Sequence, residues 1–464
     1  MKRRFGRLSP SDLSNLRLET LSSPFHFGAL LTVDGPPLLD VSGRLRTEEI
    51  TDRFARRLSR VPQLRRRLCF PGVLRGRALW VDDVAFDIRR HIRVSEVDAP
   101  GGDAALLETG ARLYGRLLDR SLPLWELWFL TGVSGNRLGV LLKLHHSVAD
   151  GAAAMAIMGV LFDIEADAPE PAAAAWSPAP APGGWPLLID NLSTKVAAVG
   201  HATGVLVHPG RVAAQTRASV RDTWRTVRRH PAAARTSINQ PVQPGRRIRF
   251  VQLDLAAARE RAHAAGAKVN DLVLDLVAGG LRELLIDRGE LVEGLVLTGT
   301  VAVSLRNANE APVLGNQVGV VMVPLPVDEA DPDRRLQTLA AATREAKSHQ
   351  RPRVAQALVE RLAATPIAQR MMARQRWVNV FSTNLVGPSV PIYVLGARVI
   401  DVIPIIQVAG NVGLAFCAIS YAGRLFVVVT ADATACPDID VVSLGMERTW
   451  RELGRSGVPS ATVG

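Results

Sequence analysis

The chain has 464 residues and 47% of them are hydrophobic, so it is long enough for two domains of ordinary size with ample core material. Its net charge of +12 attracts polyanions, but the arginines are scattered and aromatic residues make up only 5%, which argues against a nucleic-acid-binding surface. Three cysteines, Cys69, Cys417 and Cys436, share no CxxC spacing, which excludes a disulfide scaffold and a thiolate zinc site.

The sequence pattern contains no segment typical of export or of membrane spanning. The basic N-terminus leads into no apolar stretch, so we expect no signal peptide. The longest apolar candidate, residues 390–410, is interrupted by Arg398, Asp401 and two prolines, and a spanning helix needs about 18 apolar residues without such breaks. We predict two buried strands there, in a protein that is soluble or only peripherally attached to a membrane.

Residues 1–165 are predicted to form a first α/β domain. Alternating or continuous apolar runs predict strands over residues 23–35 and 137–146. Apolar residues at helical spacing predict amphipathic helices over residues 47–61 and 103–119.

Residues 166–245 are predicted to connect two domains. Residues 166–186 are rich in proline and alanine and carry no periodicity, which is typical of a linker. Helical spacing follows, and the basic segment from Arg211 to Arg229 permits two interpretations. It could lie on anionic lipid, or it could be a solvated helix that bridges the domains, which its weakly apolar face favours.

Residues 246–464 alternate between strand and helix patterns, which is typical of a second α/β domain. We predict strands over 247–255, 294–306 and 316–327, helices over 256–267, 269–289, 335–350 and 438–457, and a hairpin over 413–432 that turns at Ala422 and Gly423.

The segment KLHHSVADG, residues 143–151, stands out because common catalytic motifs are absent. The sequence contains no GxSxG elbow, no Walker A sequence, no strand–GxGxxG–helix unit and no HExxH pair. The motif places two adjacent histidines at the end of a predicted buried strand and an aspartate and a glycine before a predicted helix.

Strand geometry separates the roles of the two histidines. Successive side chains of a strand point to opposite faces, so His145 and His146 are not expected to reach one metal ion or one substrate together. A single imidazole that works as a general base is the chemical interpretation. The structural interpretation is that both histidines pack in the core, that Asp150 caps the next helix, and that Gly151 relaxes the backbone there.

Several stretches in addition to HHxxxDG carry a resemblance to a known family. They include LSPSDL, FHFGALLTVDG, VPQLRRRL, the PLW of LDRSLPLWE, VNDLVLDLVAGGLRELL, SLRNANEAPVLGNQVGVVMVPLP and TNLVGPSVPIYVLGARV. Their order and spacing resemble the bacterial wax ester synthase/diacylglycerol acyltransferase family over nearly the whole chain. That family belongs to the CoA-dependent acyltransferase superfamily, whose signature is HHxxxDG.

The resemblance implies an α/β fold of two chloramphenicol acetyltransferase-like halves, each a mixed sheet with helices, with an active-site tunnel between them. It implies that His146 is the general base in a ternary complex, with His145, Asp150 and Gly151 supporting the loop. Other implied site residues are Pro123 and Trp125, which would line an acyl path but could equally be a buried strand start, Asn270 and Asp271, which could equally cap a helix, and Asn316 and Gln317.

We therefore expect an acyl-CoA-dependent O-acyltransferase that esterifies diacylglycerol, long-chain alcohols or both, to give triacylglycerol or wax esters. Acyl-CoA would be a co-substrate, and no cofactor, metal or nucleic acid is expected. The enzyme would be cytoplasmic and peripheral, at the inner membrane face or on lipid droplets. Two alternatives remain open: a condensation-type acyltransferase with a carrier-bound donor, and a lipid-binding or droplet protein without turnover. Acceptor choice, acyl length and oligomeric state depend on features that no motif reports.

Overall fold

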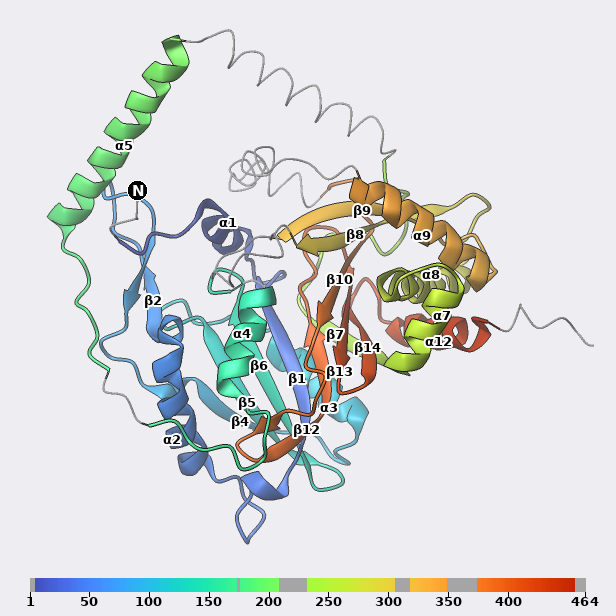
Figure 1. Ribbon diagram of the computed structural model, residues 1–464, viewed down its shortest axis with the longest axis horizontal. Coiled ribbons are helices and arrows are strands. Elements are labelled where there is room, and N and C mark those ends of the chain that lie inside the picture. The colour runs from blue at the N-terminus through green and yellow to red at the C-terminus, as the bar shows by residue number, and fades with distance from the viewer. Residues whose placement is uncertain are drawn as a thin grey trace, which may run out of the picture.

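The computed structural model describes residues 5–149, 151–172, 176–207, 232–304, 318–348 and 374–454. Asp150, Asn316, Gln317 and the basic segment from Arg211 to Arg229 therefore lie outside the described residues. Figure 1 shows two sheets side by side, each with its own helices. In the described part of the chain, no helix is both long enough and apolar enough to cross a membrane.

The first sheet contains six strands in the order β11-β12-β1-β6-β5-β4. Of the five pairs of neighbouring strands in this sheet, β4 and β5 run parallel and the other four pairs are antiparallel. The strands are β1 (His26–Asp34), β4 (Ile92–Glu96), β5 (Trp125–Val133), β6 (Arg137–His145), β11 (Tyr393–Val394) and β12 (Ala397–Ile405). Strands β11 and β12 come from far along the chain, so this sheet is built from both ends of the sequence.

The second sheet also contains six strands, in the order β7-β14-β13-β10-β8-β9. Strand β10 runs parallel to β13 and to β8, and the other pairs are antiparallel. The strands are β7 (Arg246–Asp254), β8 (Val296–Ser304), β9 (Val318–Pro326), β10 (Val380–Val386), β13 (Leu414–Tyr421) and β14 (Arg424–Asp432). The predicted hairpin is confirmed, with positive φ angles of 45° at Ala422 and 80° at Gly423.

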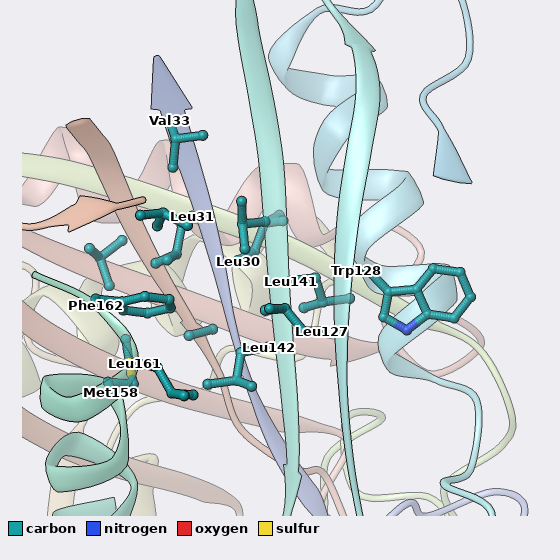
Figure 2. Close-up of a cluster of buried hydrophobic side chains, with 14 of the residues drawn as sticks. Leu30, Leu31, Val33, Leu127, Trp128, Leu141, Leu142, Met158, Leu161 and Phe162 are labelled. Carbon is teal, nitrogen blue, oxygen red and sulfur yellow. The ribbon is translucent and has the colours of Figure 1, made fainter. Parts of the chain in front are cut away.

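Helices α3 and α4 cover opposite faces of the first sheet. Figure 2 shows Met158, Leu161 and Phe162, at the end of α4, facing Leu31 and Leu142 of the strands. On the other face α3 approaches β1 so closely that a Cβ at Gly28 would lie 3.0 Å from the Tyr114 ring. The helices of this half are α1 (Pro10–Leu18), α2 (Thr47–Arg57), α3 (Asp103–Tyr114) and α4 (Gly151–Leu161), with 3₁₀ turns at Pro36–Leu38, Leu58–Arg60, Pro62–Arg65 and Ile88–Arg90.

Helices of the second half lie on the outer face of the second sheet (Figure 1). Its inner face contributes Ile419, Phe426 and Val428 to the core of the first sheet, so the two halves share one hydrophobic layer. The helices are α7 (Leu255–Ala264), α8 (Val269–Asp287), α9 (Pro332–Ser348) and α12 (Ile439–Glu452). The predicted fold of two mixed α/β halves is confirmed, and the tunnel between them stays a prediction.

A hairpin and a long helix complete the first half of the chain. Strands β2 (Arg66–Cys69) and β3 (Leu79–Asp82) form an antiparallel hairpin. Helix α5 (Gly184–Val207) follows the proline-rich segment and stands clear of both sheets in Figure 1.

A buried ion pair joins three helices of the second half. The Arg335 guanidinium on α9 donates from Nε to Asp275 Oδ1 on α8 at 2.6 Å, and its Nη2 lies 3.4 Å from Thr449 Oγ1 on α12. Both charged side chains are almost wholly buried. Because removal of one partner leaves an uncompensated charge in a low-dielectric core, this pair is more costly to break than to replace.

We expect Arg335→Met to lower the free energy of unfolding by about 3–5 kcal/mol, because Asp275 would then be buried without a partner. The double variant Arg335→Met/Asp275→Leu should lose much less. Urea unfolding measures both, with the exposed neighbour substitution Arg334→Met as the control. Equal stability of the single variant and the wild type would contradict this role of the pair.

Candidate active site

The HHSVADG motif lies at the end of β6, where both sheets meet. Strand β6 pairs with β1 in antiparallel register, which sets His145 opposite His26. The chain leaves the strand at His146, whose backbone N–H donates to the Phe25 carbonyl at 3.1 Å. Helix α4 begins at Gly151, after which the chain returns along the sheet. The position of Asp150 lies outside the described residues.

His145 is fully buried, and both of its ring nitrogens face protein groups. Its Nδ1 accepts from the backbone N–H of Ser147 at 3.0 Å and lies 2.7 Å from the Ser147 hydroxyl. Its Nε2 lies 3.4 Å from Glu19 Oε1. His145 is therefore a fixed part of the loop.

Glu19 is a buried carboxylate that contacts three separate segments of the chain, one of which carries His145. Its Oε1 accepts from the Phe25 backbone N–H, and its Oε2 accepts from Arg120 Nη2 at 2.8 Å. Burial alone would raise the pKa of Glu19, but hydrogen bonding and charge from His145, together with Arg120, hold this pKa at about 2. Glu19 is thus ionised at neutral pH, and it ties α1 and the 19–25 segment to the motif.

His146 has quite different surroundings. Its ring is only partly buried and meets the rings of Phe25 and Phe27 edge-on, with centroids 5.9 and 5.2 Å away. Its Nε2 lies 2.8 Å from the side-chain amide oxygen of Gln407, which follows β12. The two adjacent imidazoles thus face different environments, and one nitrogen of His146 meets a polar group from the second half of the chain.

A buried polar layer supports the strand end beneath the motif. Lys143 is fully buried, and its ammonium donates to the Leu113 and Arg116 carbonyls at the end of α3 and to Glu126 Oε2, at 3.0, 2.7 and 3.2 Å. A cation at a helix C-terminus is favourable because it meets unpaired carbonyl groups. His26, beside it, donates to the Tyr114 carbonyl, and burial followed by the charge of Lys143 lowers its pKa well below the usual range.

Pro123 and Trp125 belong to the packed start of β5. Trp125 is 3% exposed, its indole N–H donates to the Leu64 carbonyl at 2.7 Å, and its ring stacks on His91 with centroids 4.5 Å apart. Pro123 is buried just before it. These contacts favour the buried-strand interpretation over the lining of an acyl path.

Asn270 and Asp271 lie in the first turn of α8. The Asp271 carboxylate accepts from the Lys268 backbone N–H at 2.9 Å, which is a capping interaction. Among the described residues, the buried Asn270 Nδ2 has no hydrogen-bond partner. A buried amide donor that is left unpaired costs free energy, so it is available to a ligand. Asn316 and Gln317 lie outside the described residues.

An arginine-lined cleft of about 460 Å³ lies where α3 meets β7. Arg112, Arg116 and Arg247 are exposed there, and no carboxylate within the described part of the chain forms an ion pair with them. The buried Arg246 forms one wall, and its Nη2 donates to the Ser22 carbonyl. Because Ser22 precedes the segment that contacts His145 and His146, this cleft is joined to the motif through one short stretch of chain.

The described residues contain no cluster of three or more His, Cys, Asp or Glu side chains arranged to hold a metal ion. The side chains around the motif are instead suited to proton transfer and to binding of polar groups.

Glu19 and Gln407 were missed by sequence reasoning. Glu19 directly follows helix α1 and Gln407 follows an apolar strand, and neither stands in a motif with a chemical signature. Only the pairing of β12 with β1 brings Gln407 to the histidines, so no local signal could have found it.

The fold consists of two mixed sheets, the first of which is completed by β12 from the C-terminal part of the chain. This fold is shared with a solved acyltransferase and with a condensation domain. The wax ester synthase/diacylglycerol acyltransferase from Marinobacter aquaeolei VT8 matches with a TM-score of 0.71 and 22% identity, over 97% of this chain and 99% of that chain. The first condensation domain of the calcium-dependent antibiotic synthetase matches with a TM-score of 0.59 and 16% identity, over 97% and 96%.

Sequence comparison identifies the family within this class. The model of the wax ester synthase/diacylglycerol acyltransferase catalytic domain matches residues 8–273, and the model of the WS/DGAT C-terminal domain matches residues 314–454. The chain therefore belongs to the wax ester synthase/diacylglycerol acyltransferase family. A putative diacylglycerol O-acyltransferase of Mycobacterium tuberculosis is 29% identical over 467 residues, covering 96% of this chain and 90% of the relative, and another is 31% identical over 418 residues, covering 84% and 79%.

We expect Glu19→Gln to lower the free energy of unfolding at pH 7 by about 3 kcal/mol, because the carboxylate has a pKa of about 2 in the fold against an ordinary value of 4.5. A lowered folded-state pKa contributes stability that is complete above pH 4.5 and is lost as the pH falls toward 2. The difference between variant and wild type should therefore shrink over that range.

Urea unfolding at pH 7 and at successively lower pH measures this difference. The exposed substitution Glu48→Gln provides the control and should leave the midpoint unchanged. A difference that stays constant with pH would contradict the role of the Glu19 charge.

Proposed function

We propose that this protein is an acyl-CoA-dependent O-acyltransferase that esterifies diacylglycerol, long-chain alcohols or both. The observation that carries the proposal is His146, a partly buried imidazole at the joint of two sheets with Nε2 held 2.8 Å from Gln407. Family membership supports the reaction class, since the relatives are named as diacylglycerol O-acyltransferases.

In the proposed reaction His146 Nε2 takes the proton of the acceptor hydroxyl while the oxygen attacks the thioester carbon. An acceptor hydroxyl would replace Gln407 as the partner of Nε2. Because the Gln407 oxygen accepts from Nε2 and a base must be unprotonated, this exchange requires the tautomer of His146 that carries its proton on Nδ1. Collapse of the tetrahedral intermediate breaks the C–S bond, the proton passes from His146 to the CoA sulfur, and the products are an ester and free CoA. Both substrates are present together, so no acyl-enzyme forms.

The other motif residues have supporting roles in this proposal. His145 holds the loop through Glu19 and Ser147, and Asp150 and Gly151 set the entry into α4. The Asn270 amide, which has no hydrogen-bond partner in the described part of the chain, is a candidate donor to the developing oxyanion, and Asn316 and Gln317 are further candidates. The packing of Trp125 and Pro123 supports only a structural contribution.

We propose further that the arginine-lined cleft holds the phosphate groups of the acyl donor. Arginine is suited to bidentate phosphate contacts, and Arg112, Arg116 and Arg247 converge there without carboxylate partners among the described residues. Arg246 links the wall of the cleft to Ser22, and Ser23 Oγ donates to the Val408 carbonyl next to Gln407. A donor anchored by its phosphates would thus extend its thioester toward the motif.

The proposal includes peripheral attachment, from the cytoplasm, to the inner membrane face or to lipid droplets. The proposed acceptors dissolve in lipid rather than in water, and the net charge of +12 favours anionic surfaces. No cofactor is required for the reaction, because the thioester supplies the energy of ester formation.

We expect His146→Ala to lower the rate of ester formation from labelled acyl-CoA by about 100-fold or more, because the general base is lost. Thin-layer separation of products from diacylglycerol and from hexadecanol measures the rate, and the exposed substitution His263→Ala serves as the control. Unchanged turnover in His146→Ala would overturn the assignment. Turnover only from a carrier-bound acyl group would favour the condensation-type alternative, and binding without product from any donor would favour a lipid-binding protein.

We expect the triple variant Arg112→Gln/Arg116→Gln/Arg247→Gln to raise the KM for acyl-CoA by about tenfold or more, because charge-assisted phosphate contacts are lost. The KM for acyl-pantetheine, which lacks the nucleotide phosphates, should not change. Substitution of three exposed arginines outside the cleft, Arg44, Arg89 and Arg334, by glutamine is the matched control. An equal rise in KM for both donors would contradict phosphate binding in the cleft.

A further inference from the structure

Helix α5 carries large apolar side chains on a face that meets solvent. Trp185, Ile189, Leu192 and Val196 are exposed to 76%, 57%, 51% and 70%. A helix turns by about 100° per residue, so spacings of four, three and four residues place these side chains in one stripe along the helix. Surface helices ordinarily point such a stripe at the core.

The opposite face of α5 attaches the helix to the protein. Leu187 is 3% exposed and packs with Leu79 and Val81 of the β2–β3 hairpin. Asp190 Oδ2 accepts from Arg7 Nε at 2.7 Å, and Asn191 Nδ2 donates to the Leu74 carbonyl at 2.7 Å. These three residues lie about half a turn from the stripe, so the apolar stripe is directed away from the body of the protein.

The apolar surface continues from the helix onto a neighbouring loop. Phe70, Val73 and Leu74 are each more than half exposed, and the bond from Asn191 to Leu74 holds this loop beside α5. We call these three residues together with the four of the stripe the α5 patch. Isolated exposed apolar residues are ordinary, but a contiguous group of this kind marks an interaction site.

The charges around the α5 patch are positive. Among residues 184–196, Asp190 is the only acidic residue, and it is paired with Arg7 on the attached face. Lys195 is exposed beside the stripe, and the Arg75 guanidinium lies against Gly184 at the start of the helix. Apolar side chains flanked by cations match an anionic lipid surface, whereas two copies of a chain with net charge +12 repel each other.

The α5 patch lies on the side of the molecule that carries the motif loop. Leu187 packs on the β2–β3 hairpin, and Leu68 of that hairpin packs with Leu8 and Leu16 next to Val148, two residues after His146. Figure 1 shows α5 and α1 toward the same end of the molecule. A surface that contacts α5 would therefore face the active-site end.

We propose that the α5 patch docks the protein on an anionic phospholipid surface, with α5 lying in the interface plane. Trp185, Ile189, Leu192 and Val196 enter the boundary between head groups and acyl chains, and Lys195 and Arg75 contact lipid phosphates. This docking rests on the proposed function in one respect: it would give the enzyme access to acceptors that reside in lipid.

Flotation with vesicles tests the proposal. The full chain should float with mixed phosphatidylcholine–phosphatidylglycerol vesicles more than with pure phosphatidylcholine vesicles, and added salt should weaken the association. The triple variant Trp185→Gln/Ile189→Gln/Val196→Gln should lower the partition coefficient by at least about tenfold, because three large side chains lose apolar burial. The matched control replaces exposed apolar residues outside the α5 patch, in the variant Val41→Gln/Val84→Gln/Leu444→Gln, and should float like the wild type.

Circular dichroism shows whether the triple variant keeps its helix content. If the triple variant loses helix content, the single substitution Trp185→Gln replaces it in the flotation test, and the partition coefficient should fall by about threefold. Equal flotation of patch variant, control variant and wild type would overturn the proposal. So would a wild-type dimer in sedimentation velocity that the patch substitutions dissociate, because the occupant would then be a second copy.

Activity toward a short, water-soluble alcohol separates this inference from the proposed function. The patch variant should esterify the soluble alcohol at the wild-type rate and lose turnover only toward hexadecanol presented in anionic vesicles. Vesicle binding without ester formation from any acceptor would defeat the proposed function and leave the docking surface intact. Ester formation from the soluble alcohol without vesicle binding would support the proposed function and overturn the docking surface.

Discussion

The pairing of β12 with β1 is the constraint on which the geometry of the site depends. Strand β12 lies in the C-terminal part of the chain, yet it continues the first sheet beside β1, with Gly28 opposite Ile405. The chain therefore leaves β12 beside the ends of β1 and β6, and Gln407 reaches His146. A shift of this register by one residue would turn every side chain of β12 to the other face and remove Gln407 from the site.

The second constraint is the buried charge under the motif. Glu19 and Lys143 are buried and each is held by several hydrogen bonds, and the exposed Arg120 pairs with Glu19. Such groups are unfavourable unless they are fully paired, so the network tolerates few arrangements. That restriction explains why His145 is so closely fixed. Its Nδ1 accepts from Ser147 and its Nε2 faces Glu19, so the loop that carries His146 is positioned as a result.

Helix α5 follows a different rule from the rest of the fold. Elsewhere the apolar faces of helices pack on the sheets, as those of α4 and α8 do. In α5 polar groups and one leucine make the attachment, and the larger apolar face is left outside. The free energy of burying that face is available to a partner surface, which is the physical basis of the proposed docking.

The sequence by itself determined the elements and the reaction class. Periodicity predicted β1, β6, the β13–β14 hairpin and most helices, because the side-chain period of a strand or helix is a local property. Strand alternation at His145 and His146 indicated that the two rings face different surroundings, and HHxxxDG with its neighbouring stretches identified the family. Only the tertiary structure decided which residues complete the site. Gln407, Glu19, the arginine-lined cleft and the outward face of α5 depend on contacts between segments far apart in the chain, and such contacts leave no periodic signal in any one of them.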